Sequence, residues 1–236
     1  VMSATPIPRT LALAAYGDMD ESKITEKPVG RLPIKTTSLS LLKEKILIER
    51  LLIKLQSNEK AYWVCPLIEE SEELDLKAAN ERYEHLNKIF NKKVLIIHGQ
   101  LKEKEKEEIM YKFQNEDYKI LVSTTVIEVG IDIKQATTII IEHAERFGLA
   151  QLHQLRGRVG RNDIQSSCIL LHKDQIGENA KKRILKMKET NDGFEIAKKD
   201  LEIRGAGEVL GRKQSGLPSF QIADLSFDDD LLEDVR

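Results

Sequence analysis

Three arginines, Arg156, Arg158 and Arg161, stand within six positions at the end of a predicted helix. Arginine stays charged at any working pH and carries a planar fork of donors that matches phosphate oxygens. Gly157 and Gly160 lie between the arginines, and without a Cβ they allow sharp turns and the close approach of a phosphate or of another domain. The residue types therefore predict a phosphate-binding segment.

A simpler interpretation is an ordinary basic helix end, where cations gain a few tenths of a kcal/mol from the helix dipole. Gln151, His153 and Gln154 weaken it, because they make the preceding turn polar where a packed helix needs an apolar stripe. We therefore expect this helix to serve something other than the core.

Two other groups of polar residues follow predicted strands. His98 and Gly99 could contact a backbone phosphate, since Gly99 frees an amide before the next helix, although a capping or turn histidine has slightly more weight on spacing alone. Thr124 and Thr125, at the next strand exit, carry short donors that suit phosphate oxygens. The alternative for the threonines is an ordinary N-cap, and for Asp132 a turn carboxylate.

These residues need a scaffold, and the chain alternates strand-like and helix-like segments. Near-continuous apolar strands separated by amphipathic helices indicate an α/β fold, a parallel sheet with helices on both faces and ligands beyond the carboxyl ends of its strands. The predicted strands are Ala61–Ile68, Val94–Ile97, Lys119–Val122, Thr137–Ile141 and Ser167–Leu171, and the predicted helices are Leu39–Gln56, Leu74–Asn91, Lys102–Asn115 and Gly148–Leu155.

The composition fits this α/β class. The chain has 37 basic and 39 acidic residues among 236, so its net charge does not indicate a nucleic-acid-binding protein. Any surface that binds nucleic acid must therefore be a local basic patch. Cys65 and Cys168 lie in apolar runs, a buried-thiol pattern that fits a reducing cytosol, and we expect a cytoplasmic protein. No zinc spacing or other metal site is predicted, and Trp63 is expected in the core rather than as a base-stacking platform.

The pattern Gln154-x-x-Gly-Arg158-x-Gly-Arg161 resembles the sixth motif of superfamily 2 helicases. The resemblance implies the second, RecA-like helicase lobe, in which two arginines reach the terminal phosphate of ATP held by a partner lobe. It assigns Arg161 as the arginine finger, Arg158 as its companion and Gln154 to the nucleotide. A guanidinium supplied to a phosphoryl-transfer transition state is worth several orders of magnitude in rate.

Two more segments carry the resemblance. Ser3–Thr10 resembles the third helicase motif, with the extension typical of the RecG and transcription-repair coupling branch. The stretch that holds Thr124 and Thr125 resembles the fifth motif, which implies that the threonines touch the DNA backbone. The same motif places Gly130 and Asp132 beside the nucleotide.

Beyond Leu171 the pattern changes to two predicted helices, Ala180–Thr190 and Phe194–Leu201, around a turn. This hairpin and the glycine-rich stretch after it closely resemble the translocation motif that the RecG and coupling-factor families share. The resemblance implies movement of duplex DNA driven by lobe closure, with Arg204, Gln214 and Arg183 as the functional polar residues. Two further details favour the RecG family, the stretch 62–70 and the ending 220–225.

The resemblance covers essentially the whole chain and divides it into three parts. We expect residues 1–30 to be the tail of a first helicase lobe and a linker, residues 31–175 the RecA-like lobe, and residues 176–236 the hairpin and translocation loop. The chain begins inside what looks like a motif, so we expect a fragment. It contains no Gly-x-x-x-x-Gly-Lys-Ser/Thr phosphate loop and no acidic Mg²⁺ box.

The resulting hypothesis is the C-terminal motor portion of an ATP-dependent DNA helicase that remodels replication forks and Holliday junctions in recombination and repair. ATP and Mg²⁺ would be held mainly by the missing first lobe, so the fragment alone is expected to be inactive. Expected partners are branched double-stranded DNA, the missing wedge domain and the first lobe, with no membrane. Two alternatives stay open: the motor of a transcription-repair coupling factor, and a non-catalytic module whose arginines grip DNA phosphates.

Overall fold

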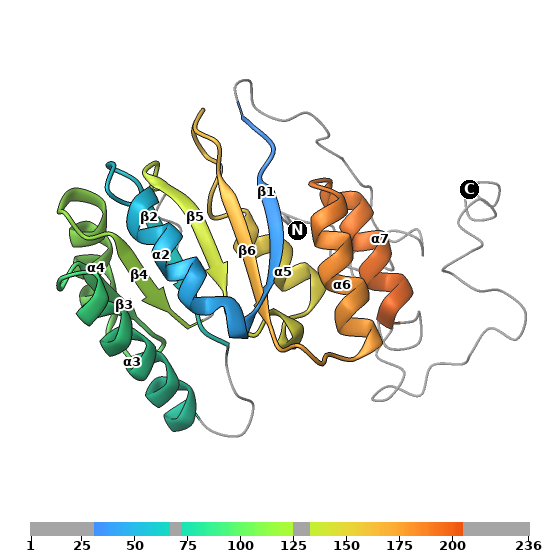
Figure 1. The fold of residues 1–236 in the computed structure, drawn as a ribbon, viewed down its shortest axis with the longest axis horizontal. Coiled ribbons are helices and arrows are strands. Elements are labelled where there is room, and N and C mark those ends of the chain that lie inside the picture. Colours follow the sequence, from blue (N-terminus) through green and yellow to red (C-terminus); the bar gives the residue numbers. More distant parts are fainter. Residues whose placement is uncertain (1–30, 67–71, 125–132, 205–236) are drawn as a thin grey trace, which may run out of the picture.

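A six-stranded, all-parallel sheet organises the molecule (Figure 1). The computed structural model describes residues 31–66, 72–124 and 133–204. The strand order is β1-β6-β5-β2-β4-β3. The strands are β1 (Lys35–Ser40), β2 (Lys60–Val64), β3 (Val94–Ile97), β4 (Ile120–Ser123), β5 (Ala136–Ile141) and β6 (Ser167–His172).

Helices connect the strands and cover both faces of the sheet. They are α2 (Glu44–Lys54), α3 (Glu72–Ile89), α4 (Glu103–Asn115), α5 (Leu149–Arg156), α6 (Glu178–Glu189) and α7 (Gly193–Arg204), with short 3-10 turns η1 (Leu41–Lys43) and η2 (Ala144–Arg146). Parallel neighbours require such crossovers, so the predicted α/β class with helices on both faces is confirmed.

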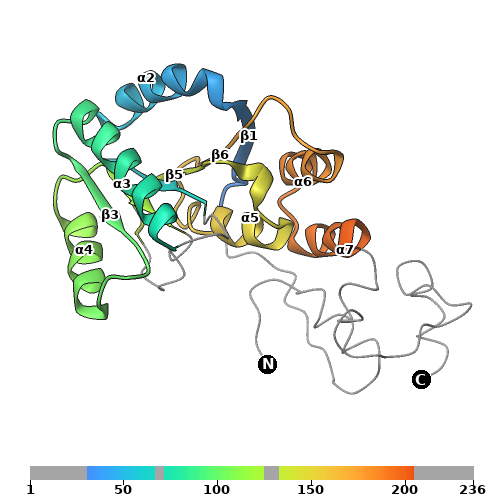
Figure 2. The ribbon, with the colours of Figure 1, turned by 90° about the horizontal axis from the view of Figure 1, so that it is seen from below.

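The core consists of two apolar layers, one on each face of the sheet. Figure 2 shows α2 and α3 on one side and α4, α5 and α7 on the other. Trp63 of β2 belongs to the α2–α3 layer and its neighbour Tyr62 to the opposite layer, as the period of two along a strand requires. Both side chains are almost fully buried, which confirms Trp63 as a core residue.

The strand β1 was not predicted from the sequence. The expected first helix, Leu39–Gln56, begins later, because Lys35–Ser40 pairs with β6 in register from Lys35–Ser167 to Ser40–His172. Ser40 then caps the turn that follows, since its Oγ accepts a hydrogen bond from the amide of Leu42 at 3.1 Å. The strand is polar because it is the edge of the sheet and is only partly buried.

The other elements agree with the prediction to within a few residues. The strand predicted over Ala61–Ile68 ends at Val64, and residues 67–68 lie outside the described residues. The hairpin is present as α6 and α7. Cys65 and Cys168 are buried free thiols, and burial raises the pKa of Cys168 to about 12. Within the described ranges, no helix is long and apolar enough to cross a membrane.

Candidate functional site

Several polar residues singled out in the sequence follow the carboxyl ends of neighbouring strands. β2 runs parallel to both β4 and β5, and β4 runs parallel to β3, so the carboxyl ends of these four strands lie together. His98, Thr124 and Glu142 are the first residues after β3, β4 and β5. This edge is where ligands of parallel sheets bind.

Ends of β3 and β4 leave buried polar atoms without partners. Within the described residues, the Oγ of Ser123, the Oγ1 of Thr124 and the Nδ1 of His98 are buried and accept or donate no hydrogen bond. Burial also lowers the pKa of His98, against a raising effect of Glu105, so its imidazole is neutral at pH 7. Buried polar atoms are normally paired, so these three are suited to a ligand.

His98 has a local role as well. Its carbonyl accepts a hydrogen bond from the amide of Leu101 at 3.3 Å, which closes the turn before α4. The backbone thus serves the turn expected in the simpler interpretation, while the Nδ1 atom is left for another contact. Four of the predicted site residues, Thr125, Gly130, Asp132 and Gln214, lie outside the described residues.

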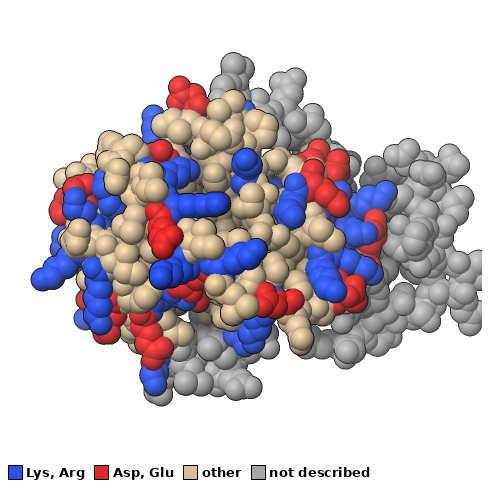
Figure 3. Space-filling view, in the orientation of Figure 1, with Lys and Arg blue, Asp and Glu red and all other residues tan. Residues whose placement is uncertain are grey.

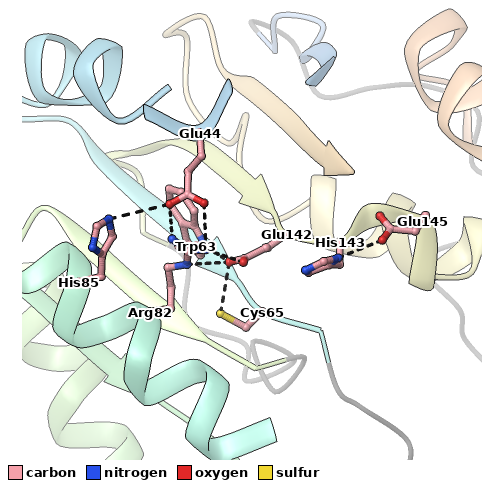
Figure 4. A network of polar contacts seen from close by, with 8 residues as sticks. All are labelled: Glu44, Trp63, Cys65, Arg82, His85, Glu142, His143 and Glu145. Atoms are coloured by element: carbon pink, nitrogen blue, oxygen red, sulfur yellow. Dashed lines mark hydrogen bonds and ion pairs between the residues drawn. The ribbon is translucent and has the colours of Figure 1, made fainter. Parts of the chain in front are cut away.

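Glu142, directly after β5, belongs to a largely buried ionic network that was not predicted from the sequence (Figure 4). Arg82 of α3 donates from Nε to Glu142 Oε2 at 2.9 Å and from Nη2 to Glu142 Oε1 at 2.6 Å. The same guanidinium pairs with both carboxylate oxygens of Glu44. It also lies over the ring of Trp63, whose Nε1 donates to Glu142 Oε2 at 2.7 Å.

This network fixes the point from which the chain leaves the sheet towards α5. Burial opposes the charge of Arg82, but the hydrogen bonds and charges of Glu142 and Glu44 outweigh it and raise the pKa of Arg82. His143 follows in the left-handed conformation, with φ 52°, and its Nδ1 lies 3.0 Å from Glu145 Oε1. The only advance signal was a carboxylate directly after a strand of isoleucines.

The helix α5 is more apolar on its inner side than predicted from the sequence. Leu149, Leu152 and Leu155 are buried in the core, at spacings of three, while Gln151 and Gln154 are exposed. The expectation that this helix does not serve the core is therefore wrong. Because the leucines anchor one side, the opposite side holds the glutamines at the surface.

The three arginines of the segment have different environments. Arg156 is only 2% exposed. Its Nη1 donates to the carbonyls of Met187, at 2.9 Å, and Thr190, at 2.8 Å, and its Nη2 lies 3.1 Å from Nδ1 of His153. A fourth contact reaches Thr36 Oγ1 of β1 at 3.4 Å. Arg156 therefore ties α5 to the end of α6 and is not part of an exposed phosphate-binding surface.

Arg158 and Arg161 lie beyond the end of α5, and both are partly exposed. The Nε of Arg161 donates to the carbonyl of Gly157 at 3.3 Å. The turn between them needs Gly160, which has φ 75° and whose Cβ would lie 2.8 Å from Ile34 Cγ1. Gly157 instead has ordinary right-handed angles, with φ −65°, so only one of the two glycines supplies a sharp turn.

The hairpin packs against the same helix. The Nη2 of Arg183, on α6, donates to the carbonyl of Glu145 at 2.9 Å, just before α5. Gly193 starts α7 beside His153, whose Nε2 would lie 3.2 Å from an added Cβ. Arg204 is the last residue of α7. The structure thus brings Arg183 to η2, before the start of α5. Within the described residues, no group of three His, Cys, Asp or Glu side chains could hold a metal ion.

Comparison with protein families agrees with this architecture. Residues 42–163 match the helicase conserved C-terminal domain, and residues 190–236 match domain 3, C-terminal, of the ATP-dependent DNA helicase RecG. The chain belongs to the helicase conserved C-terminal domain family.

Within that family, the chain resembles RecG over its whole length. It is 47% identical over 238 residues to the ATP-dependent DNA helicase RecG of Pasteurella multocida (strain Pm70), which covers 100% of the chain and 34% of the relative. It is 48% identical over 241 residues to that of Bacillus subtilis (strain 168), with 100% and 35% covered. The chain thus spans about a third of the length of the curated relatives it matches.

A solved structure of RecG bound to a three-way DNA junction is similar as well. It matches with a TM-score of 0.76 and 46% identity, over 99% of this chain and 30% of that one.

Proposed function

We propose that this chain is the C-terminal motor portion of an ATP-dependent DNA helicase that remodels replication forks and Holliday junctions. The observation that carries the proposal is the position of α5. At its end are Arg158 and Arg161, and its buried Arg156 and His153 contact the hairpin. One helix therefore connects the segment proposed for ATP with the segment proposed for DNA.

In this proposal, Arg161 is the arginine finger and Arg158 its companion. Both stabilise the charge that spreads over the equatorial oxygens of the transferred phosphoryl group. Gln154, exposed on α5, and Gly130 and Asp132 contact the nucleotide. ATP phosphates and Mg²⁺ are held mainly by a first helicase lobe, because this sequence contains no phosphate loop.

DNA lies, we further propose, at the carboxyl edge of β3 and β4 and along the hairpin. His98, Gly99, Thr124 and Thr125 position the DNA backbone, since the buried hydroxyl of Thr124 and Nδ1 of His98 lack protein partners within the described part of the chain. Arg183, Arg204 and Gln214 take the translocation role. The expected substrate is branched double-stranded DNA, because the similar RecG structure is bound to a three-way junction.

The division of the chain belongs to the same proposal. Residues 1–30 are the tail of the first lobe, residues 31–175 the RecA-like lobe, and residues 176–236 the hairpin and translocation loop. The remaining partners are the first lobe and a wedge domain, and the expected location is the cytoplasm.

The test is DNA-stimulated ATP hydrolysis by the full-length protein. Replacing Arg161 by Ala should lower kcat by about three orders of magnitude, because the finger acts only in the transition state. Arg158→Ala should have a similar effect. The control is Arg146→Ala, since Arg146 is an exposed residue of η2 outside the arginine segment.

Two results would contradict the proposal. One is hydrolysis that is unchanged by Arg161→Ala. The other is a loss of DNA affinity by Arg158→Ala that is equal with and without ATP and steeply salt-dependent, which would indicate a non-catalytic module that grips phosphates.

A further inference from the structure

One side of the sheet is covered less completely than the other. On β6 the alternate side chains Cys168 and Leu170 point to the layer of α5, α6 and α7 and are fully buried. Their neighbours Ser167 and Ile169 point to the α2 side and remain partly exposed. Within the described residues, α2 and α3 are the helices of that side, and they leave β6 and β1 partly open (Figure 1).

A groove of about 430 Å³ lies in this opening. Its floor is formed by strand residues and its wall by Lys43, the last residue of η1, and one side of α2. The lining residues are Thr37, Ser38, Leu39, Lys43, Ile46, Leu47, Arg50, Leu51, Lys54, Thr138, Ser167 and Ile169. Every charged residue among them is basic. In the space-filling view of this face, Lys and Arg side chains predominate over its middle (Figure 3).

The residues that form the wall of the groove follow one another at helical spacing. Lys43, Ile46, Leu47, Arg50 and Lys54 are separated by steps of three, one, three and four, so they share one side of the helix. Lys54 is occupied, because its Nζ donates to Thr138 Oγ1 at 2.9 Å and lies 3.5 Å from Glu59. Lys43 and Arg50 make no ion pair within the described residues.

Apolar surface continues from the groove around α2. Ile46 is 48% exposed, and beside the groove Leu42 and Ile53 are 83% and 70% exposed. Single exposed apolar residues are common, but an apolar groove with further exposed apolar residues beside it and basic residues along it is typical of an interaction surface. The apolar lining indicates a protein ligand, because DNA phosphates placed against Leu39 or Ile169 would gain nothing from the apolar surface.

We propose that this groove docks an amphipathic, acidic helix of a partner protein. Its apolar side lies on Leu39, Ile46 and Ile169, and its carboxylates pair with Lys43 and Arg50. Such a helix would run beside α2 and add the layer that the open part of the sheet lacks. The 11 residues of α2 span about 16 Å, so three turns of a partner helix match the length of the groove.

The proposal can be tested with a designed probe and the full-length protein. The probe is a 14-residue peptide with leucines at helical spacing on one side and glutamates elsewhere, and a second peptide has lysines in place of the glutamates. Titration calorimetry should give a dissociation constant of about 10 μM for the acidic peptide, with binding by the lysine peptide at least about tenfold weaker.

A matched pair of variants locates the binding. Arg50→Glu reverses a charge in the groove and should weaken binding of the acidic peptide at least about tenfold. Lys45→Glu makes the same charge change on the same helix, but Lys45 is exposed and does not line the groove. It should change the affinity less than about twofold. ATP hydrolysis should be unaffected in both, so this test is independent of the proposed motor function.

Several outcomes would overturn the proposal. One is the absence of binding by the acidic peptide at about 1 mM, a concentration on the order of the dissociation constants of the weakest specific complexes. Equal binding of both peptides, or equal losses in the two variants, would mean that the groove charges do not select the ligand. Slower hydrogen exchange of α2 in the full-length protein than in this chain alone would mean that another part of the same protein covers the groove.

Discussion

Arg82 is the residue on which four elements of the α2–α3 side converge. It joins Glu44 at the start of α2 and Glu142 at the end of β5, and it lies over Trp63 of β2 (Figure 4). Its side chain is 15% exposed, so the pairs are largely shielded from solvent. Arg82 contributes to stability less through the energy of any one hydrogen bond than by neutralising two carboxylates that would otherwise be close together.

Replacing Arg82 by Met should lower the free energy of unfolding by about 3–5 kcal/mol, because two carboxylates would be left close together and unpaired. The measurement is urea unfolding of the purified protein. Adding Glu142→Gln to Arg82→Met should restore part of this loss, since it removes the more buried of the two charges. A double variant as unstable as the sum of the single variants would contradict this account.

Thr124 offers a way to separate stability from DNA binding. Its Oγ1 is buried without a partner within the described residues, so Thr124→Val should change the free energy of unfolding by less than about 0.5 kcal/mol. If the hydroxyl contacts DNA, the same change should weaken DNA binding about fivefold or more. The control, Thr138→Val, removes a buried hydroxyl that accepts from Lys54, and should cost stability but leave DNA binding intact.

At the scale of residues, the sequence predicted which side chains could bind phosphate better than it predicted where those side chains lie. It grouped three arginines because they share charge and spacing, yet Arg156 is buried and burial lowers its pKa. No local pattern separates it from Arg158, because its partners are carbonyls of a helix more than 30 residues away. The Arg82–Glu142 pair, 60 residues apart, was hidden for the same reason.

At the scale of elements, the contact between α5 and the hairpin is the most consequential. The carbonyls of Met187 and Thr190, at the end of α6, are satisfied by Arg156 and not by the helix itself. The hairpin is therefore held to α5 by a charged, buried donor. Motion of one element then requires motion of the other or loss of these bonds.

Arg156→Met should cost about 3 kcal/mol in the free energy of unfolding, because the carbonyls of Met187 and Thr190 lose a charged donor while remaining buried. In the helicase proposed above, it should also reduce DNA unwinding per ATP hydrolysed. Arg146→Met, an exposed control, should change stability by less than about 0.5 kcal/mol. Intact coupling of unwinding to hydrolysis in Arg156→Met would contradict a role of this contact in coupling.

The turn after α5 should depend on the backbone conformation of Gly160. Gly160→Ala should cost about 2 kcal/mol, because alanine is strained at φ 75° and its Cβ would meet Ile34. Gly177→Ala is the matched control, since an added Cβ there has nothing within 4 Å and φ is −64°. It should cost less than about 1 kcal/mol. Equal losses in thermal unfolding would show that backbone conformation is not the cause.

Elements were predicted well where burial imposes a pattern. The apolar run Val94–Ile97 and the helix Lys102–Asn115 agree with β3 and α4 almost residue by residue. The edge strand β1 was missed because its threonines and serines resemble a loop, and only pairing with β6 makes it a strand. Pairing with a neighbouring strand, and not the local sequence, thus determines that this polar segment is a strand.

At the scale of the whole molecule, the proposed function divides the work between two lobes, because this sequence offers arginines for ATP but contains no phosphate loop. We expect the isolated chain to hydrolyse ATP no faster than buffer, at any DNA concentration, since its sequence contains neither a phosphate loop nor an acidic Mg²⁺ box. The measurement is phosphate release by the purified chain. Turnover that depends on Arg161 would contradict the division of roles between two lobes.

The position of Trp63 has a practical consequence. It is the single tryptophan of the chain, it is fully buried, and its indole touches both Arg82 and Glu142. Intrinsic fluorescence excited at the indole band therefore comes from one known spot, between α3 and the end of β5. A red shift of its emission reports solvent entry at that junction, with no dye attached.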